Sequence, residues 1–264
     1  MMKYAVSVMD TDSTKKIEAS GKQILKKLQI YARHLNKLTE YELPRGIVFH
    51  DLQSATELYS TIPLPAYTSR NLIHITPLVD TWKEIYLSSA SDSQAASDYF
   101  HALDLDDVAA IAAHELTHHA DFFHSEFETW EEEDEEDMWF EEGMCEYLPR
   151  KFMFSEEKLD KILSVEADLI ERFKSEFGMY PLSSFGKAGY RGGNSQGYAT
   201  AFYDYWRSCI TVMRLIEEYC DGEVEQLIAH YRDWVEGERK TNLQNFFIGT
   251  LELNTNQAKE LWLK

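Results

Sequence analysis

The stretch "DLDDVAAIAAHELTHHADFF", residues 104–123, determines how the rest of this 264-residue chain is interpreted. Its opening "DLDD" is a helix-start signal, and the acids also suit the positive end of the helix dipole. The small and apolar residues that follow predict a buried helix. On that helix His114 and His118 lie four positions apart, so their imidazoles project from one face about 40° apart and can bind one metal ion.

Glu115 follows the first of these histidines and is rotated from it by about 100° around the helix axis. A side chain in this direction is badly placed to be a third ligand. Glu115 would instead lie beside the open coordination position of a bound metal, where a general base is needed. His119 directly follows His118 and points elsewhere, so we expect a structural or outer role for it. Six histidines lack a partner at a diagnostic spacing and are assigned no role: His34, His50, His74, His101, His124 and His230.

Composition limits the classes of protein to consider. With 44% hydrophobic and 27% charged residues, the chain has no stretch near the roughly 20 apolar residues of a membrane helix. The N-terminal segment is too short and polar for a secretory signal, and three widely spaced cysteines favour reduced thiols, so we expect a cytoplasmic location. The net charge of −20 argues against nucleic acid and anionic membranes as partners. The oligomeric state is not predicted.

Much of the negative charge lies in "EFETWEEEDEED", residues 126–137, which holds nine acids and no basic residue. Such a run is typical of a solvated loop. A loop of this charge close in sequence to the histidine helix could also guide a basic substrate or cover a cleft. Both interpretations stay open from sequence alone.

Hydrophobic periodicity and turn residues predict an α+β fold that is mostly helical. A small sheet and the histidine helix would form a lobe over residues 1–150, and helices over 151–264 would form a second lobe that completes a cleft. The predicted strands are 46–51 and 71–76. The predicted helices are 13–39, the histidine helix that begins after the acids at 104–107, 137–148 (ended by Pro149), 155–177 and 198–220, with two or three shorter ones after them.

A third metal ligand is suggested by "WFEEGMCEY", residues 139–147. This segment resembles the W-[LF]-x-E-G-x-A helix of gluzincin zinc metallopeptidases, and "HELTH" is also found in the thermolysin-like members of that group. The resemblance implies a zincin-like lobe, zinc as cofactor and Glu142 as the third ligand. It also implies that Glu146, four residues later on the same helix face, holds His114. Glu141 is turned away by about 100° and is expected to be solvated.

The C-terminal half carries a weaker resemblance to the same enzymes. "YWRSCITVMRLIEEYCDG" is similar to their pattern Y-x-x-S-x-x-x-V-x-x-L-x-x-x-Y-G, but departs from it at "CDG", where Cys220 and Asp221 stand before the glycine. By this register Tyr205 is the expected donor to the oxyanion of the reaction, and Tyr198, seven residues earlier on the same face, is the alternative. The G-x-M-E-N strand of related aminopeptidases is absent, which weakens an exopeptidase interpretation.

These features lead to a hypothesis of a zinc metallopeptidase that hydrolyses peptide bonds, with Glu115 as general base. Its substrate would be a peptide or protein, and the negative net charge favours a basic one. The first alternative is a non-catalytic protein that keeps a gluzincin scaffold and captures a basic partner through its acidic loop. The second is a helical structural protein with fortuitous histidines, which predicts no stoichiometric metal. Sequence does not define the cleavage preference.

Overall fold

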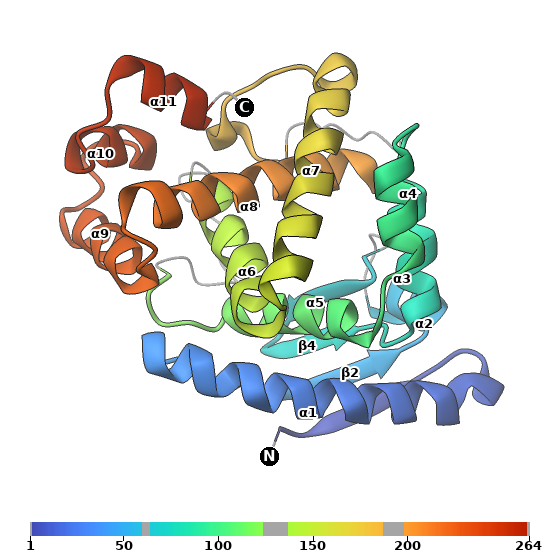
Figure 1. Ribbon diagram of the computed structural model, residues 1–264. Helices are drawn as coiled ribbons and strands as arrows, with labels where there is room; N and C mark the ends of the chain where they lie inside the picture. Colours follow the sequence, from blue (N-terminus) through green and yellow to red (C-terminus); the bar gives the residue numbers. More distant parts are fainter. Residues whose placement is uncertain (1, 60–63, 124–136, 187–197, 263–264) are drawn as a thin grey trace.

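The computed structural model describes residues 2–59, 64–123, 137–186 and 198–262 (Figure 1). It has a mostly helical α+β fold, as predicted, with one four-stranded sheet and eleven α-helices in these ranges. The strands are β1 (Tyr4–Ser7), β2 (Gly46–His50), β3 (Ala66–Ser69) and β4 (Leu72–Ile75). The helices are α1 (Thr14–Leu38), α2 (Leu52–Ser54), α3 (Val79–Leu87), α4 (Gln94–His101), α5 (Leu105–Thr117), α6 (Met138–Met153), α7 (Glu156–Phe177), α8 (Ala199–Tyr219), α9 (Val224–Glu236), α10 (Leu243–Thr250) and α11 (Thr255–Trp262).

The sheet has the order β1-β2-β4-β3, in which β1, β2 and β4 are parallel and β3 runs antiparallel to β4. The predicted strands correspond to β2 and β4, whereas β1 and β3 were not predicted. Both are four residues long, and none of their residues is fully buried, so they lack the apolar signal that marked the inner strands. Pairing with β2 and β4 decides their conformation.

A two-residue hairpin turn joins β3 to β4. Arg70 and Asn71 both have positive φ, 53° and 57°, and Ser69 pairs with Leu72 across the turn. Positive φ at both central positions defines the turn type whose twist matches paired strands. In the described sheet β3 pairs with β4 alone, so it is an edge strand.

One face of the sheet is covered by α1 and α5, which also contact each other (Figure 1). A Cβ at Gly21 of α1 would lie 2.4 Å from the ring of Phe49 on β2, so the helix approaches the sheet closely only because this position has no side chain. Ile47, Ile73 and Ile75 complete the fully buried surface beneath the helices. Helix α5, which carries the histidines, is thereby fixed against the sheet.

The start of α5 is as predicted. Asp104 accepts hydrogen bonds from the first turn, and the Asp107 side chain accepts one from the Asp104 backbone, which completes a capping box. The helix ends at Thr117, within the segment predicted to carry the histidines. His118 is its C-cap and keeps helical dihedrals, and Ala120 then pairs with Tyr41 in an isolated antiparallel bridge. This pairing with a distant segment diverts the chain from the helix.

The predicted end of α6 at Pro149 is wrong, because the helix continues to Met153. Proline removes the backbone bond to the carbonyl of Cys145, but it leaves the rest of the turn intact. Arg150, in the following turn, is buried and forms ion pairs with Glu146 and Glu166. Tertiary contacts therefore outweigh the local preference. Because α6 spans residue 150, that helix belongs to both predicted lobes, and the division into lobes stays a prediction.

The C-terminal helices α9, α10 and α11 follow α8, as the sequence predicted, and lie at one end of the molecule (Figure 1). Helix α8 packs along α6 and α7. Its buried residues include charged Asp204 and Arg207, which an apolar stripe does not reveal. Within the described ranges, no helix is both long and apolar enough to cross a membrane.

Gly143 allows α6 and α8 to approach closely. A Cβ at this position would lie 2.6 Å from the backbone oxygen of Ser208 and 2.7 Å from Val212 Cγ2. We predict that Gly143→Ala lowers the free energy of unfolding by about 1–3 kcal/mol in urea titrations, since overpacking forces the backbone to shift. Gly249→Ala on α10, where a Cβ meets nothing within 4 Å, is the control and should be neutral or stabilising. Equal stability of the two variants would contradict the packing argument.

Candidate metal centre

Three potential ligand atoms from α5, its C-cap and α6 converge in the interior. The Nε2 atoms of His114 and His118 are 3.1 Å apart, and Oε2 of Glu142 lies 3.2 Å from the first and 3.5 Å from the second. All three residues are at most 9% exposed. The structure thus brings together the ligand set predicted from the sequence.

The spacing of these atoms fits a tetrahedral ion. Zinc binds imidazole nitrogen and carboxylate oxygen at about 2.0–2.1 Å, so neighbouring ligands in a tetrahedron are about 3.3 Å apart. The three observed separations, 3.1, 3.2 and 3.5 Å, bracket this value. Two imidazoles and one carboxylate also leave a fourth position for water or substrate, as in catalytic zinc sites. These residues could therefore hold one zinc ion.

The charges around the cluster favour a cation there. Burial opposes the charged form of His114, but Glu142 and Glu146 outweigh it and hold the pKa of this imidazole well above its ordinary value. Burial would likewise raise the pKa of Glu142, yet the two histidines lower it to about 2. Two buried carboxylates directed at one imidazole thus require positive charge, which protons or a divalent ion can supply.

Glu115 lies beside the cluster and is only 6% exposed. Burial raises the pKa of its carboxyl, against the opposing effects of the two histidines and of Thr68. The Thr68 hydroxyl on β3 donates a hydrogen bond of 2.8 Å to Oε2 of Glu115. Thr68 carries no signal in the sequence, because nothing in the short edge strand indicates that this strand meets α5. The sheet edge therefore orients the carboxylate next to the ligands.

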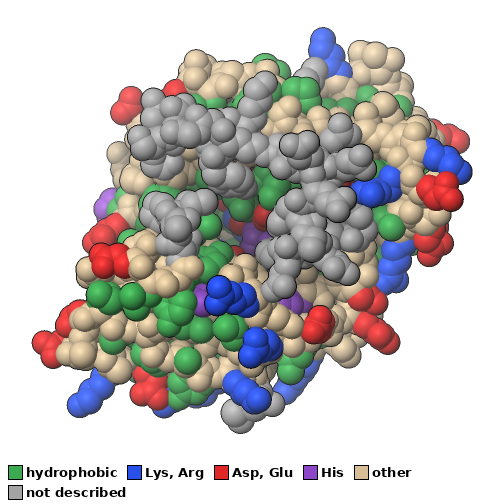
Figure 2. All heavy atoms as spheres, turned by 180° about the vertical axis from the view of Figure 1, so that it is seen from behind, with side chains coloured by type: hydrophobic (Ala, Val, Ile, Leu, Met, Phe, Trp, Pro, Cys, Tyr) green, Lys and Arg blue, Asp and Glu red, His purple; other side chains and the backbone are tan. Residues whose placement is uncertain are grey.

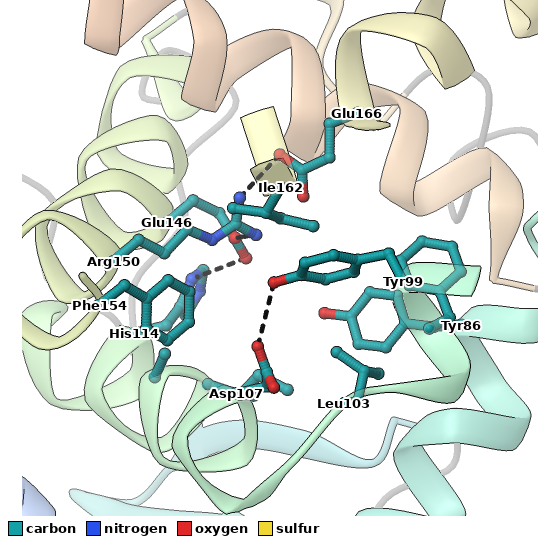
Figure 3. Close-up of a pocket in the computed structure, with 13 residues that line it drawn as sticks. Tyr86, Tyr99, Leu103, Asp107, His114, Glu146, Arg150, Phe154, Ile162 and Glu166 are labelled. Atoms are coloured by element: carbon teal, nitrogen blue, oxygen red, sulfur yellow. Dashed lines mark hydrogen bonds and ion pairs between the residues drawn. The ribbon is translucent and has the colours of Figure 1, made fainter. Parts of the chain in front are cut away.

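Glu146 is positioned on the opposite side of His114 from the ligand cluster. Its Oε1 lies 3.2 Å from Nδ1 of His114, the ring nitrogen that does not face Glu142 (Figure 3). A carboxylate at this nitrogen selects the tautomer whose Nε2 carries a free lone pair. The structure thus places the predicted outer partner in ion-pair contact with His114, while its role at a metal centre stays a prediction.

Of the two candidate tyrosines, Tyr205 is the one that contacts the cluster. Its ring centroid lies 5.9 Å from that of His114, and Phe185 packs edge-on against it at 5.2 Å. Tyr198 is the N-cap residue of α8, and its ring stacks on Phe202 at 6.2 Å. Among the described ring contacts, Tyr205, and not Tyr198, packs against the candidate ligand His114.

One expectation about the glutamates is wrong. Glu141 was expected to be solvated, but it is only 2% exposed, because α6 is enclosed by α1, α5, α7 and α8. It is nevertheless not part of the group of converging ligand atoms, which agrees with its direction on the helix. His119 also lies outside that group, and burial together with His118 lowers its pKa to about 4.

On the face of the molecule seen in Figure 2, histidine and acidic side chains are visible close together among the described residues. His50 and His74, two of the histidines that were assigned no role, are buried on neighbouring strands of the sheet, where their ring centroids lie 5.8 Å apart. Residues 126–136 of the acidic run and His124 lie outside the described residues. Of that run, only Asp137 is described, and it is the N-cap of α6.

Comparisons of the chain with protein-family models, with curated proteins and with solved structures give no match. A functional assignment therefore depends on the geometry and chemistry of the site itself.

We predict that Glu142→Gln weakens zinc binding by more than the roughly 10–100-fold that loss of an outer partner costs, because it removes a charged ligand. Glu141→Gln is the matched control, since it makes the same change to a buried neighbour on the same helix and should keep wild-type affinity. Both affinities are measured by competition with a chromogenic chelator. Loss of zinc from the Glu141 variant instead would reverse the ligand assignment.

Proposed function

We propose that this protein is a zinc-dependent peptidase that hydrolyses peptide bonds. The observation that carries the proposal is the triangle of His114 Nε2, His118 Nε2 and Glu142 Oε2, whose 3.1–3.5 Å edges fit tetrahedral zinc. Glu115, a carboxylate that is not a ligand, lies next to this triangle. A metal with an open position beside a buried carboxylate is the arrangement that activates water for hydrolysis.

The chemistry is divided among residues of the chain. When bound, zinc would bring the pKa of water toward neutrality and polarise the scissile carbonyl. Glu115 would accept the proton of the attacking water and return it to the leaving amine, while Thr68 holds the carboxylate in place through its 2.8 Å hydrogen bond. Tyr205 is the proposed donor to the oxyanion of the tetrahedral intermediate.

A peptide substrate is supported by the sheet edge beside the site. β3 is the edge strand of the described sheet, and its Thr68 contacts Glu115. An extended peptide can pair with the backbone of such an edge. A basic substrate is favoured by the net charge of −20. We also propose a cytoplasmic location, which agrees with three cysteines that are all free and buried.

The proposed function is tested by measuring zinc content and cleavage of a mixed peptide library with the purified protein and its Glu115→Gln variant. We expect one zinc per chain in both proteins and hydrolysis by the wild type only. The variant keeps the size of the side chain and all three ligands but lacks the base.

The alternatives give different results in the same experiment. A non-catalytic binding protein retains zinc and cleaves nothing, and a structural protein with fortuitous histidines binds no stoichiometric metal. Full peptidase activity in Glu115→Gln would refute the role of the base. Activity of the wild type without bound zinc would refute the role of the metal.

For the oxyanion donor, we predict that Tyr205→Phe lowers kcat and kcat/KM together by roughly 100-fold or more, because the phenol acts only in the transition state. Zinc content and thermal unfolding should be unchanged. Tyr198→Phe is the control and should cleave at nearly the wild-type rate, since its ring packs on Phe202. A crippled Tyr198 variant beside an active Tyr205 variant would exchange the two assignments.

A further inference from the structure

Behind the ligand cluster, four ionisable side chains lie in series from His114 to α7 (Figure 3). Nδ1 of His114 is 3.2 Å from Oε1 of Glu146. The other oxygen of Glu146, Oε2, forms an ion pair with Nη2 of Arg150. Nη1 of the same guanidinium donates a hydrogen bond of 2.7 Å to Oε2 of Glu166. Both oxygens of Glu146 and two nitrogens of Arg150 are therefore engaged.

The outer members of this series are deeply buried. Arg150 is 7% exposed and Glu166 is 1% exposed. Together with Tyr86 and Tyr99 they line a cavity of about 30 Å³, which is room for only a few water molecules. Removing such charges from water is costly, and well-packed apolar residues often stabilise a fold as well as a buried ion pair does. Stability alone therefore does not account for this choice of residues.

The shape of the arginine side chain explains better why this position carries a buried ion pair. The guanidinium is a planar fork, so one Arg150 can hold two carboxylates in fixed directions, whereas an ammonium group acts as a single point charge. With Oε2 held by Arg150, the plane of the Glu146 carboxylate is fixed, and Oε1 stays directed at His114. Glu166 in turn fixes the guanidinium of Arg150 and connects it to α7.

We propose that Arg150 and Glu166 are positioning residues of the metal centre, which hold Glu146 and through it set the orientation of the His114 imidazole. This proposal rests on the proposed function, because it assumes that His114 binds zinc. A purely structural role, in which the ion pairs only tie α6 to α7, makes a different prediction. It links these residues to stability and not to zinc affinity.

The test uses a charge-balanced double variant, Arg150→Met with Glu166→Leu, which replaces the ion pair by apolar side chains and leaves Glu146 in place. Arg150→Lys, which keeps the charge but not the fork, is the second variant. The control is Lys151→Met with Glu217→Leu. It removes a neighbouring ion pair of 2.6 Å between α6 and α8. Zinc affinity is measured on the full chain by chelator competition, and folding by thermal unfolding without zinc.

We expect the double variant to bind zinc at least about 10-fold more weakly than the wild type. This is the lower end of the loss seen when a residue that holds a metal ligand is removed. The zinc affinity of Arg150→Lys should lie between those of the double variant and the wild type, and the control should bind zinc like the wild type. Wild-type affinity in a folded double variant would overturn the proposal. If the double variant does not fold, Arg150→Lys decides, because unchanged affinity there contradicts the fork argument.

Failure of this inference can be told apart from failure of the proposed function. A wild-type protein that binds zinc and cleaves peptides, beside a double variant of equal zinc affinity, overturns only the positioning role. A wild type that binds zinc but cleaves nothing overturns peptidase activity, while weaker binding by the double variant still supports the positioning role. A wild type that does not bind zinc overturns both.

Discussion

The site depends on the contact between α5 and α6, which brings one carboxylate to two imidazoles. Helix α5 and its C-cap can offer His114 and His118, but the third candidate ligand, Glu142, lies 24 residues further along the chain. Gly143, next to Glu142, allows α6 to lie against the backbone of α8, so α6 is confined between α5 and α8. This packing determines where the carboxylate lies, and the other features of the site follow from it.

Charge is the second constraint, because the centre is buried and rich in carboxylates. Glu115, Glu142, Glu146 and Glu166 are all largely excluded from water, whereas Arg150 is the cation that contacts two of them. Buried charges of one sign are unstable unless an opposite charge is placed among them. A divalent cation at the His114–His118–Glu142 cluster would meet this requirement on one side, as the guanidinium of Arg150 does on the other.

Much of the site could be predicted from the sequence, since helix geometry relates spacing to direction. The i, i+4 pairs His114–His118 and Glu142–Glu146 each share a helix face, and the structure brings both pairs together as predicted. Glu141 does not join the group of converging atoms, in line with its direction on the helix, but its burial could not be predicted. Periodicity gives the direction of a side chain and not what packs on that side of the helix.

Other features depend on tertiary contacts that no local pattern contains. Thr68 reaches Glu115 because a hairpin places the edge strand β3 next to α5, and neither strand length nor composition indicates this. The continuation of α6 beyond Pro149 depends on Arg150 and its partner on α7. The ion pair between Glu146 and Arg150 has the i, i+4 spacing that helices favour. Glu166 pairs with Arg150 from another helix, and no spacing in the sequence relates the two residues.

The central claim, that the three convergent atoms form a zinc site, is tested most directly by anomalous diffraction at the zinc edge from crystals of the zinc-loaded protein. The account predicts one strong peak at about 2.0–2.1 Å from Nε2 of His114, Nε2 of His118 and a carboxylate oxygen of Glu142. A peak elsewhere, or zinc bound by other residues while these three stay in direct contact with one another, would contradict it.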